Sequence, residues 1–270
     1  MQQSLQSFLI SVLAGLLLIV LEKWLFPRLA KNSPLYRKYY LFVFLCLFVI
    51  LNIIYKSYFP QRFWDFVLIT AIIFGWIIFR ELNQFWVLGM VGADRETRLG
   101  ISYKKALSLC TSSFDFLGIG AGKLRSEQSA FEAAIDRCSR PDRSIRFLLC
   151  RPDSEGLRRI AQSAGRSEDS YRKVVLESLR TLAILKNERA KNIQVRLYTE
   201  FPVFRLMFIN DEICLASHYV LGKGGDGSNA PQIHIVKTKS PDIESLYYGF
   251  HWYFERIWQD SIDWDFKTYL

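Results

Sequence analysis

The sequence from residue 144 to residue 154 reads Ser-Ile-Arg-Phe-Leu-Leu-Cys-Arg-Pro-Asp-Ser. Its apolar part has the length and composition of a strand buried in a sheet, and Pro152 ends that strand because it cannot donate a ladder hydrogen bond. Asp153 or Ser154 can then cap a helix, since both side chains accept hydrogen bonds from free backbone N–H groups. A buried strand that leads straight into a helix is the building unit of an α/β sheet.

The same alternation continues on both sides of this segment. Short apolar runs predict further strands, and segments with helical spacing of apolar residues predict helices. The expected strands are residues 114–119, 192–199, 203–209, 212–217 and 232–237, and the expected helices are residues 103–111, 126–138, 170–189 and 242–259. Strands interleaved with helices predict an α/β fold, a mixed sheet flanked by helices, in one domain over residues 101–270.

Three apolar runs precede this domain. They cover residues 5–26, 39–55 and 63–79, and each has about the length that a helix needs to cross a hydrocarbon core of roughly 30 Å. The first run is not expected to be a cleaved signal peptide, because no basic segment precedes it and no small-residue cleavage site follows it. We therefore predict three N-terminal transmembrane α-helices within residues 1–80 and a juxtamembrane connector over residues 81–100.

The charges of the connecting segments indicate the orientation of these helices. Lysine and arginine are frequent after the first run and after the third, and sparse between the second and the third. Excess basic residues stay on the cytoplasmic side of a membrane. The sequence therefore predicts a multi-pass protein of the cell inner membrane, with its N-terminus outside and its C-terminal domain in the cytoplasm. Its basic flanks favour contact with the anionic headgroups of the lipid bilayer.

Charge and cysteine content exclude some classes of function. The formal net charge is +9, of which residues 1–99 contribute +5 (10 basic, 5 acidic) and residues 100–270 contribute +4 (25 basic, 21 acidic). The C-terminal part is too mildly basic to indicate a nucleic-acid surface. The five cysteines are scattered singly, with no Cys-x-x-Cys pair or Cys/His cluster. We expect no metal site and no cofactor, and isolated thiols fit a reducing cytoplasm.

The order of elements, together with two segments, resembles one half of a phospholipase D-like fold. The first segment is the strand-to-helix stretch quoted above, which is similar to the corresponding element of degenerate family members. The second runs from Pro202-Val-Phe-Arg-Leu-Met-Phe-Ile-Asn-Asp211 to Leu215-Ala-Ser-His218, where active members carry H-x-K-x-x-x-x-D followed by G-S-x-N. The resemblance covers about residues 103–260 and implies a degenerate single half fused to the membrane helices. Because such halves pair, it also implies a homo-oligomer.

The motif positions imply that this domain has lost the family's chemistry. The position of the histidine nucleophile is Phe204, and the position of the phosphate-binding lysine is Leu206. Asp211 stands at the aspartate position and Ser217 matches the serine of the second motif, so both are candidate ligand contacts. Catalysis needs a nucleophile paired with an acid or base, which phenylalanine and leucine cannot supply. The resemblance therefore implies a pseudoenzyme with no catalytic residues.

A glycine-rich loop offers a separate candidate for ligand binding. Residues 118–123 read Gly-Ile-Gly-Ala-Gly-Lys, which matches neither the P-loop spacing nor G-x-G-x-x-G. A loop of this kind between a strand and a helix can still present backbone N–H groups to an anion, which makes Gly120, Gly122 and Lys123 candidates. The alternative is that these glycines serve tight-turn geometry alone. A second glycine-rich stretch, residues 222–227, is expected to be a flexible loop or a closing segment.

Four further side chains are candidate ligand contacts. His218 follows the partial G-S position, and His234 points from the sheet face opposite to its isoleucine neighbours. Arg151 and Arg205 are candidate anion contacts at strand ends. For each of the four, a structural or solvated role is the alternative.

Three hypotheses for function follow. The first is a membrane-anchored sensor or effector whose silent domain binds a nucleotide, a nucleic acid or a lipid headgroup and controls the membrane helices, by analogy with bacterial immunity or stress proteins. The second is a divergent phosphodiesterase or phospholipase, which would need a histidine as its nucleophile. The third is a membrane anchor for a protein partner. The sequence ranks them in this order and does not identify the ligand.

Overall fold

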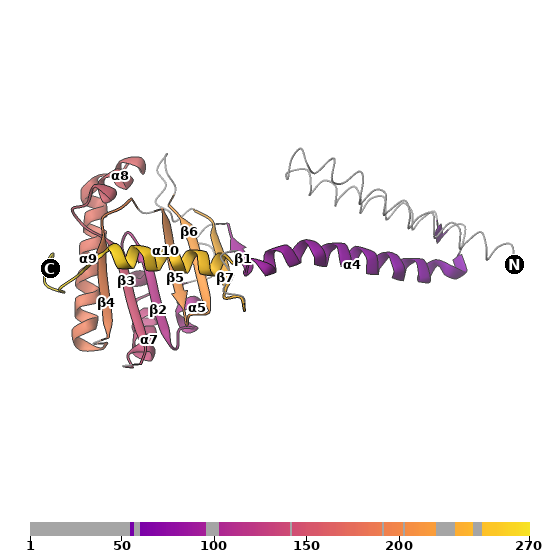
Figure 1. Ribbon diagram of the computed structural model, residues 1–270, viewed down its shortest axis with the longest axis horizontal. Helices are drawn as coiled ribbons and strands as arrows, with labels where there is room; N and C mark the ends of the chain where they lie inside the picture. Colours follow the sequence, from indigo (N-terminus) through magenta and orange to yellow (C-terminus); the bar gives the residue numbers. More distant parts are fainter. Residues whose placement is uncertain are drawn as a thin grey trace. The chain divides into compact units, whose positions relative to one another are not determined.

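A computed structural model describes the chain over residues 55–56, 60–95, 103–140, 142–190, 192–201, 203–219, 230–239 and 245–270. The chain divides into two compact units, Met1–Arg80 and Glu81–Leu270. The second unit is built on one mixed sheet with helices packed on it (Figure 1). This confirms the α/β class predicted from the alternation of strands and helices.

The sheet has eight strands in the order β1-β7-β6-β5-β2-β3-β4-β8. They are β1 Met90–Asp94, β2 Ser113–Gly118, β3 Ser144–Cys150, β4 Ile193–Tyr198, β5 Phe204–Ile209, β6 Ile213–His218, β7 Gln232–Val236 and β8 Ile262–Asp263. β2, β3 and β4 run parallel to one another, and each of the other pairings is antiparallel. The segment 81–100, expected to be a connector, contributes β1 to one edge of this sheet.

The helices of the second unit cover both faces of the sheet. They are α5 Tyr103–Ser108, α6 Gly122–Ser126, α7 Gln128–Cys138, α8 Glu155–Ser163, α9 Glu168–Glu188 and α10 Leu246–Asp260. α10 crosses one face, and α5, α7 and α9 lie behind the sheet in the same view (Figure 1). The helix expected at residues 126–138 is α7, which begins two residues later with Glu127, not Ser126, at its N-cap position, and the short helix α6 precedes it. Ser154 caps α8 as predicted, because its Oγ accepts a hydrogen bond from Leu157 N at 3.2 Å.

The alternation of side chains along each strand assigns residues to the two faces. Phe114 of β2 and Phe147 of β3 contact the ring of Phe131 in α7, so they define what we call the α7 face. Phe208 of β5 contacts Tyr247 and other rings of α10, so it defines the α10 face. Both faces are closed by buried apolar side chains. Neighbouring residues of one strand therefore sit in two separate layers of the core.

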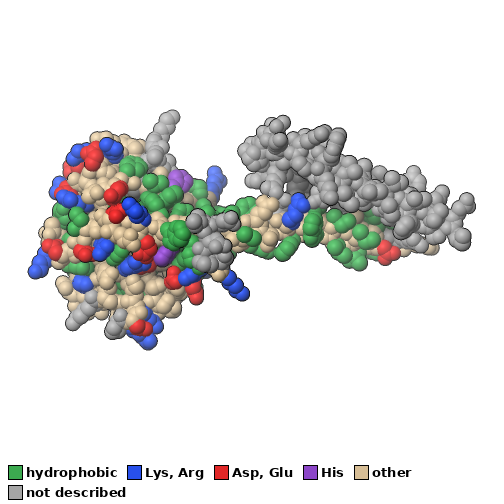
Figure 2. All heavy atoms as spheres, in the orientation of Figure 1, with side chains coloured by type: hydrophobic (Ala, Val, Ile, Leu, Met, Phe, Trp, Pro, Cys, Tyr) green, Lys and Arg blue, Asp and Glu red, His purple; other side chains and the backbone are tan. Residues whose placement is uncertain are grey.

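The structure describes only part of the predicted membrane region, residues 1–80. The first two expected spans, 5–26 and 39–55, lie outside the described residues apart from Tyr55. The third falls within α4, Phe63–Val87, which follows a short 3-10 turn, η3 Pro60–Arg62. Large apolar side chains of α4 are exposed, namely Trp64, Leu68, Ile69, Ile72, Trp76 and Phe79 (Figure 2). None of the helices in the described part of the chain is long and apolar enough to cross a membrane.

Candidate anion-binding site

A cavity of about 350 Å³ opens on the α7 face of the second unit. Its volume lies within the range of small-molecule pockets. Its walls come from the end of β2 and the loop after it, from α6, from the start of α9 and from the adjoining ends of β5 and β6. The lining residues are Phe116, Ile119, Gly120, Gly122, Lys123, Leu124, Arg166, Ser170, Tyr171, Val174, Arg205 and Tyr219. We call this cavity the basic pocket.

Three cations reach the basic pocket from three different elements. Lys123 comes from α6, Arg166 from the segment between α8 and α9, and Arg205 from β5. Among the described residues that line the pocket, none is acidic. Three basic groups around one small space create a local positive field that attracts an anion, and charge-assisted hydrogen bonds to phosphate or carboxylate oxygens are among the strongest in proteins.

The loop after β2 lines the pocket and is held by two hydrogen bonds to other elements. The N–H of Ile119 donates to the hydroxyl of Tyr219 at 2.8 Å, and the N–H of Ala121 donates to Ser178 Oγ of α9 at 2.9 Å. These two amides already have intramolecular acceptors. An anion bound by the loop backbone therefore cannot use these two amides.

Gly120 and Gly122 are required by close packing of this loop on α9. A Cβ added at Gly120 would lie 3.2 Å from both Val174 Cγ1 and Ser178 Oγ, and one added at Gly122 would lie 3.3 Å from Val174 Cγ1. Such contacts are tighter than ordinary van der Waals contact, so a side chain here would push the loop away from the helix. Both glycines line the basic pocket, but neither is among the glycines with positive φ.

Arg205 is positioned by the neighbouring strand. Its Nε donates to Ser217 Oγ of β6 at 3.2 Å, and the two residues are partners in the β5–β6 register. Ser217 is buried and does not line the pocket. The structure thus brings four of the predicted ligand contacts, Gly120, Gly122, Lys123 and Arg205, to one cavity, with Ser217 supporting Arg205.

Phe204 and Leu206, which the resemblance places at the histidine and lysine positions of the motif, lie on the other face of the sheet. The ring of Phe204 packs edge-on against Phe250 and Tyr253 of α10, at centroid distances of 5.2 and 5.4 Å. Leu206 has the same strand parity and is fully buried. His218 is paired across the strands with Phe204, is exposed, and does not line the pocket. The α10 face around these motif positions is therefore filled by aromatic side chains packed under α10.

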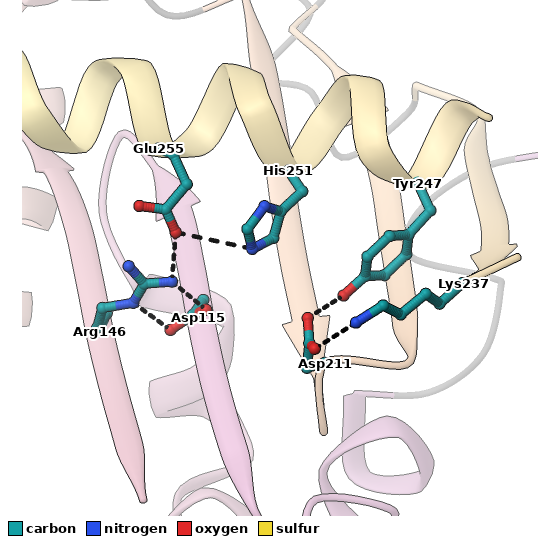
Figure 3. A network of polar contacts seen from close by, with 7 residues as sticks. All are labelled: Asp115, Arg146, Asp211, Lys237, Tyr247, His251 and Glu255. Carbon is teal, nitrogen blue, oxygen red and sulfur yellow. Dashed lines mark hydrogen bonds and ion pairs between the residues drawn. The ribbon is translucent and has the colours of Figure 1, made fainter. Parts of the chain in front are cut away.

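Asp211 lies at the far end of β5 from Arg205. It sits in the tight β5–β6 turn with a φ of +56°, as the Asn-Asp sequence predicted. Its carboxylate is paired with Lys237 and accepts a hydrogen bond from the Tyr247 hydroxyl at 2.8 Å (Figure 3). Burial disfavours the charge of Asp211, but Lys237 and Tyr247 outweigh it and lower the pKa of the carboxyl. Asp211 therefore links the β5–β6 turn to α10 and does not line the basic pocket.

The other two predicted contacts are also engaged elsewhere. Arg151 forms an ion pair with Asp153 at 2.6 Å, just after β3. His234 Nε2 of β7 lies 2.6 Å from Asp94 Oδ2 of β1, at the edge of the sheet. Neither lines the basic pocket. The glycine-rich stretch 222–227 lies outside the described residues.

A polar network under α10 was not predicted. Arg146 of β3 donates from Nε and Nη2 to the two carboxylate oxygens of Asp115 at 2.8 and 2.7 Å, and from Nη2 to Glu255 of α10 at 2.7 Å (Figure 3). Its guanidinium also lies 4.9 Å from the ring centroid of Phe254 and 5.3 Å from that of Trp258. Burial raises the pKa of Asp115, and the bonds from Arg146 oppose that shift. The sequence hint to this network is that two otherwise apolar strands each contain one charged residue, Asp115 in β2 and Arg146 in β3.

His251 extends this network along α10. Its Nε2 lies 3.7 Å from Glu255 Oε1, one helical turn away, and its ring stacks on Tyr247 (Figure 3). Arg146 binds the carboxylates of both Asp115 in β2 and Glu255 in α10, so this network fastens α10 to the sheet. Among the described residues, no group of histidine, cysteine and carboxylate side chains is arranged to hold a metal ion.

Comparisons with known proteins give little beyond the architecture. No family model matches the sequence, and the curated proteins compared with it give no match either. Among solved structures, the fold is similar to that of Nuc from Salmonella typhimurium, a phospholipase D family member, with 12% sequence identity and a TM-score of 0.39. The match covers 64% of this chain and 95% of that one.

Proposed function

We propose that the α/β unit of this protein binds a small phosphate-bearing molecule in the basic pocket. The observation that carries the proposal is the convergence of Lys123, Arg166 and Arg205, from three separate elements, on one cavity. Cationic side chains that share one cavity raise its positive potential, which favours a bound anion. A phosphate group, with its several acceptor oxygens, suits three donors better than a single carboxylate does.

The size of the pocket favours a small molecule. A volume of about 350 Å³ accommodates a mononucleotide or a lipid headgroup, but not an extended nucleic-acid strand. Phe116, Tyr171 and Tyr219 add apolar ring surface to the walls. The same phosphate chemistry can come from a free nucleotide or from a phospholipid, and the experiment below distinguishes the two sources.

Binding, and not hydrolysis, is the activity that the lining residues support. The polar side chains that reach the pocket are cations and the hydroxyls of Ser170, Tyr171 and Tyr219. The Tyr219 oxygen already accepts a hydrogen bond from Ile119 N, which fixes its orientation. A phosphodiesterase would need an activated nucleophile with an adjacent general base, so we propose a receptor site.

We propose further that residues 1–80 attach this unit to a membrane and respond to its ligand. Three apolar runs support the attachment, together with the exposed tryptophan, isoleucine and phenylalanine side chains of α4, a surface unsuited to water. The chain passes from α4 directly into β1, where Gly89 O accepts from Val236 N at 2.8 Å and Leu88 O accepts from Leu246 N at 3.2 Å. A change in the sheet edge or in the start of α10 would therefore act on the residues that follow α4.

The proposal is tested by calorimetric titration of the full chain in detergent. The ligands are inorganic phosphate, AMP and glycerophosphoethanolamine. We expect saturable binding of a phosphate compound by the unmodified chain and at least a tenfold weaker affinity for Arg205→Gln. The matched control is Arg151→Gln, because Arg151 is an arginine of the same unit that lies outside the pocket.

The ligand series separates the outcomes. Preference for AMP identifies a nucleotide site, and preference for glycerophosphoethanolamine identifies a headgroup site. Binding that is equal in the Arg205→Gln and Arg151→Gln variants would contradict the proposal, as would the absence of heat with all three compounds. In that case a protein partner at the membrane becomes the better account of the chain.

A further inference from the structure

Two buried cysteines face each other at the amino edge of the parallel strands. Cys110 lies between α5 and β2, and Cys138 is the last residue of α7. Their sulfur atoms are 3.2 Å apart, and neither residue is exposed to solvent. This contact joins two segments 28 residues apart in the sequence.

The backbone around both sulfurs is held by side chains from neighbouring elements. Arg137 Nε donates to the carbonyl of Cys110 at 2.7 Å, and Asn192 Nδ2 donates to the carbonyl of Cys138 at 3.0 Å. Arg143 Nη1 donates to the carbonyl of Arg137. A disulfide has an S–S length of roughly 2.0 Å, so the two sulfurs need to approach by about 1 Å.

The surroundings also distinguish the two thiols. The hydrogen-bond contact with Cys110 lowers the pKa of the Cys138 thiol, with Arg143 and Arg137 acting in the same direction and burial opposing them. The same contact, together with burial, raises the pKa of Cys110. Cys138 is therefore the thiol that ionises first and the better attacking group.

We propose that Cys110 and Cys138 form a reversible oxidation site that reacts with small-molecule disulfides. When the last turn of α7 opens locally, the Cys138 thiolate attacks one sulfur of the reagent, forms a mixed disulfide and expels one thiolate. Cys110 then loses its proton and attacks Cys138 Sγ, which forms the Cys110–Cys138 bond and expels the second thiolate. The two cysteines lose two electrons and two protons, and the reagent is reduced to two thiols. This site is independent of the basic pocket.

The bond would fasten the end of α7 to the segment that enters β2. In the unfolded chain it would close the loop between residues 110 and 138, which reduces the conformational freedom of that state. The oxidised protein is therefore the more stable form. Disulfides in reducing compartments are mostly transient and redox-sensing, which is the use that fits two buried thiols held in contact.

The site is tested by peptide mapping of the full chain in detergent after incubation with oxidised glutathione. Free thiols are alkylated under denaturing conditions, and the chain is digested with trypsin without reduction. We expect the peptide of residues 106–123 to be linked to the peptide of residues 138–143. Cys150→Ser and Cys214→Ser serve as matched controls, since both cysteines are buried in the same unit, and both variants should keep the link.

A second measurement addresses the folded state directly. Oxidation should raise the melting temperature by on the order of 5 °C, and dithiothreitol should reverse the rise. Cys138→Ser and Cys110→Ala should each abolish it. Recovery of Cys110 and Cys138 on separate alkylated or glutathionylated peptides would overturn the proposal, and so would a link that forms only in denaturant.

Discussion

Arg146 and Asp115 form a two-bond ion pair between neighbouring parallel strands, within an otherwise apolar part of the sheet. The residues are register partners of β3 and β2, and both point to the α10 face. Glu255 brings a second carboxylate to the same guanidinium from α10. One arginine therefore connects two strands and a helix, and its loss leaves the buried Asp115 carboxylate without the guanidinium that binds both of its oxygens.

This asymmetry predicts unequal effects of the single variants. Arg146→Leu should lower the free energy of unfolding by about 3 kcal/mol, because it leaves Asp115 buried and unpaired. Asp115→Leu should cost less, since Arg146 keeps Glu255 as a partner. The double variant should be more stable than Arg146→Leu alone. Urea unfolding followed by circular dichroism measures all three, and a double variant less stable than Arg146→Leu would contradict this account.

Two helical glycines should respond to alanine in opposite directions. A Cβ at Gly156, in the first turn of α8, would lie 2.3 Å from the carbonyl oxygen of Glu200, so the backbone must shift. We expect Gly156→Ala to lower the free energy of unfolding by about 2 kcal/mol. For Gly249 in α10, no atom of the described residues outside its own stretch of helix lies within 4 Å of such a Cβ. Gly249→Ala should therefore stabilise the protein by about 0.5–1 kcal/mol, and equal thermal shifts in the two variants would refute the packing argument.

Much of the sheet was predictable, because its central strands are continuous apolar runs and their ends carry turn residues. The expected strands all occur in the structure, with shifts of a residue or two at their ends. The edge strands β1 and β8 were not predicted. β8 has two residues, too few to show a period, and β1 is a strand through its pairing with β7 and not through its own composition. Edge strands depend on tertiary context, which local patterns do not contain.

The candidate site was predictable only in part. The place of Lys123 after a glycine-rich loop and that of Arg205 at a strand end indicate anion contacts, and both side chains line one cavity. Arg166 was missed because it lies in the segment between α8 and α9, where no periodicity indicates which way a side chain points. The sequence also did not predict on which face of the sheet the cavity lies. The motif alignment drew attention to Phe204 and Leu206, whereas the alternation of the strand sends Arg205 to the opposite side.

Asp211 should make stability depend on pH in the acid range. Its folded-state pKa lies below the usual value because of Lys237 and Tyr247, so folding favours the ionised carboxylate. Its contribution is complete above the unfolded pKa of about 3.9 and is lost as the pH falls through the folded value. The partial exposure of the pair limits the effect to about 1 kcal/mol.

The matched variant for this prediction is Asp211→Asn, since asparagine tolerates the positive φ at this turn position. The difference in unfolding free energy between the original chain and Asp211→Asn should be largest near pH 6 and should shrink toward pH 3. Urea unfolding at several pH values measures that difference. A constant difference over this range would show that the Asp211 carboxylate adds no stability through its charge.

Because Arg166 lines the basic pocket, we predict that it contributes to ligand binding, a role that the sequence around it does not indicate. If three cations share one bound phosphate, removal of the one in the loop between α8 and α9 should weaken binding by about 1.5 kcal/mol, or roughly tenfold. Arg159→Gln is the matched control, since Arg159 is an exposed arginine of α8 that pairs with Glu155 and does not line the pocket. Titration at two salt concentrations should also show a weaker salt dependence for Arg166→Gln, because one fewer charge meets the ligand. Equal affinities for the two variants would exclude Arg166 from the site and leave Lys123 and Arg205 as its only cations among the described residues that line it.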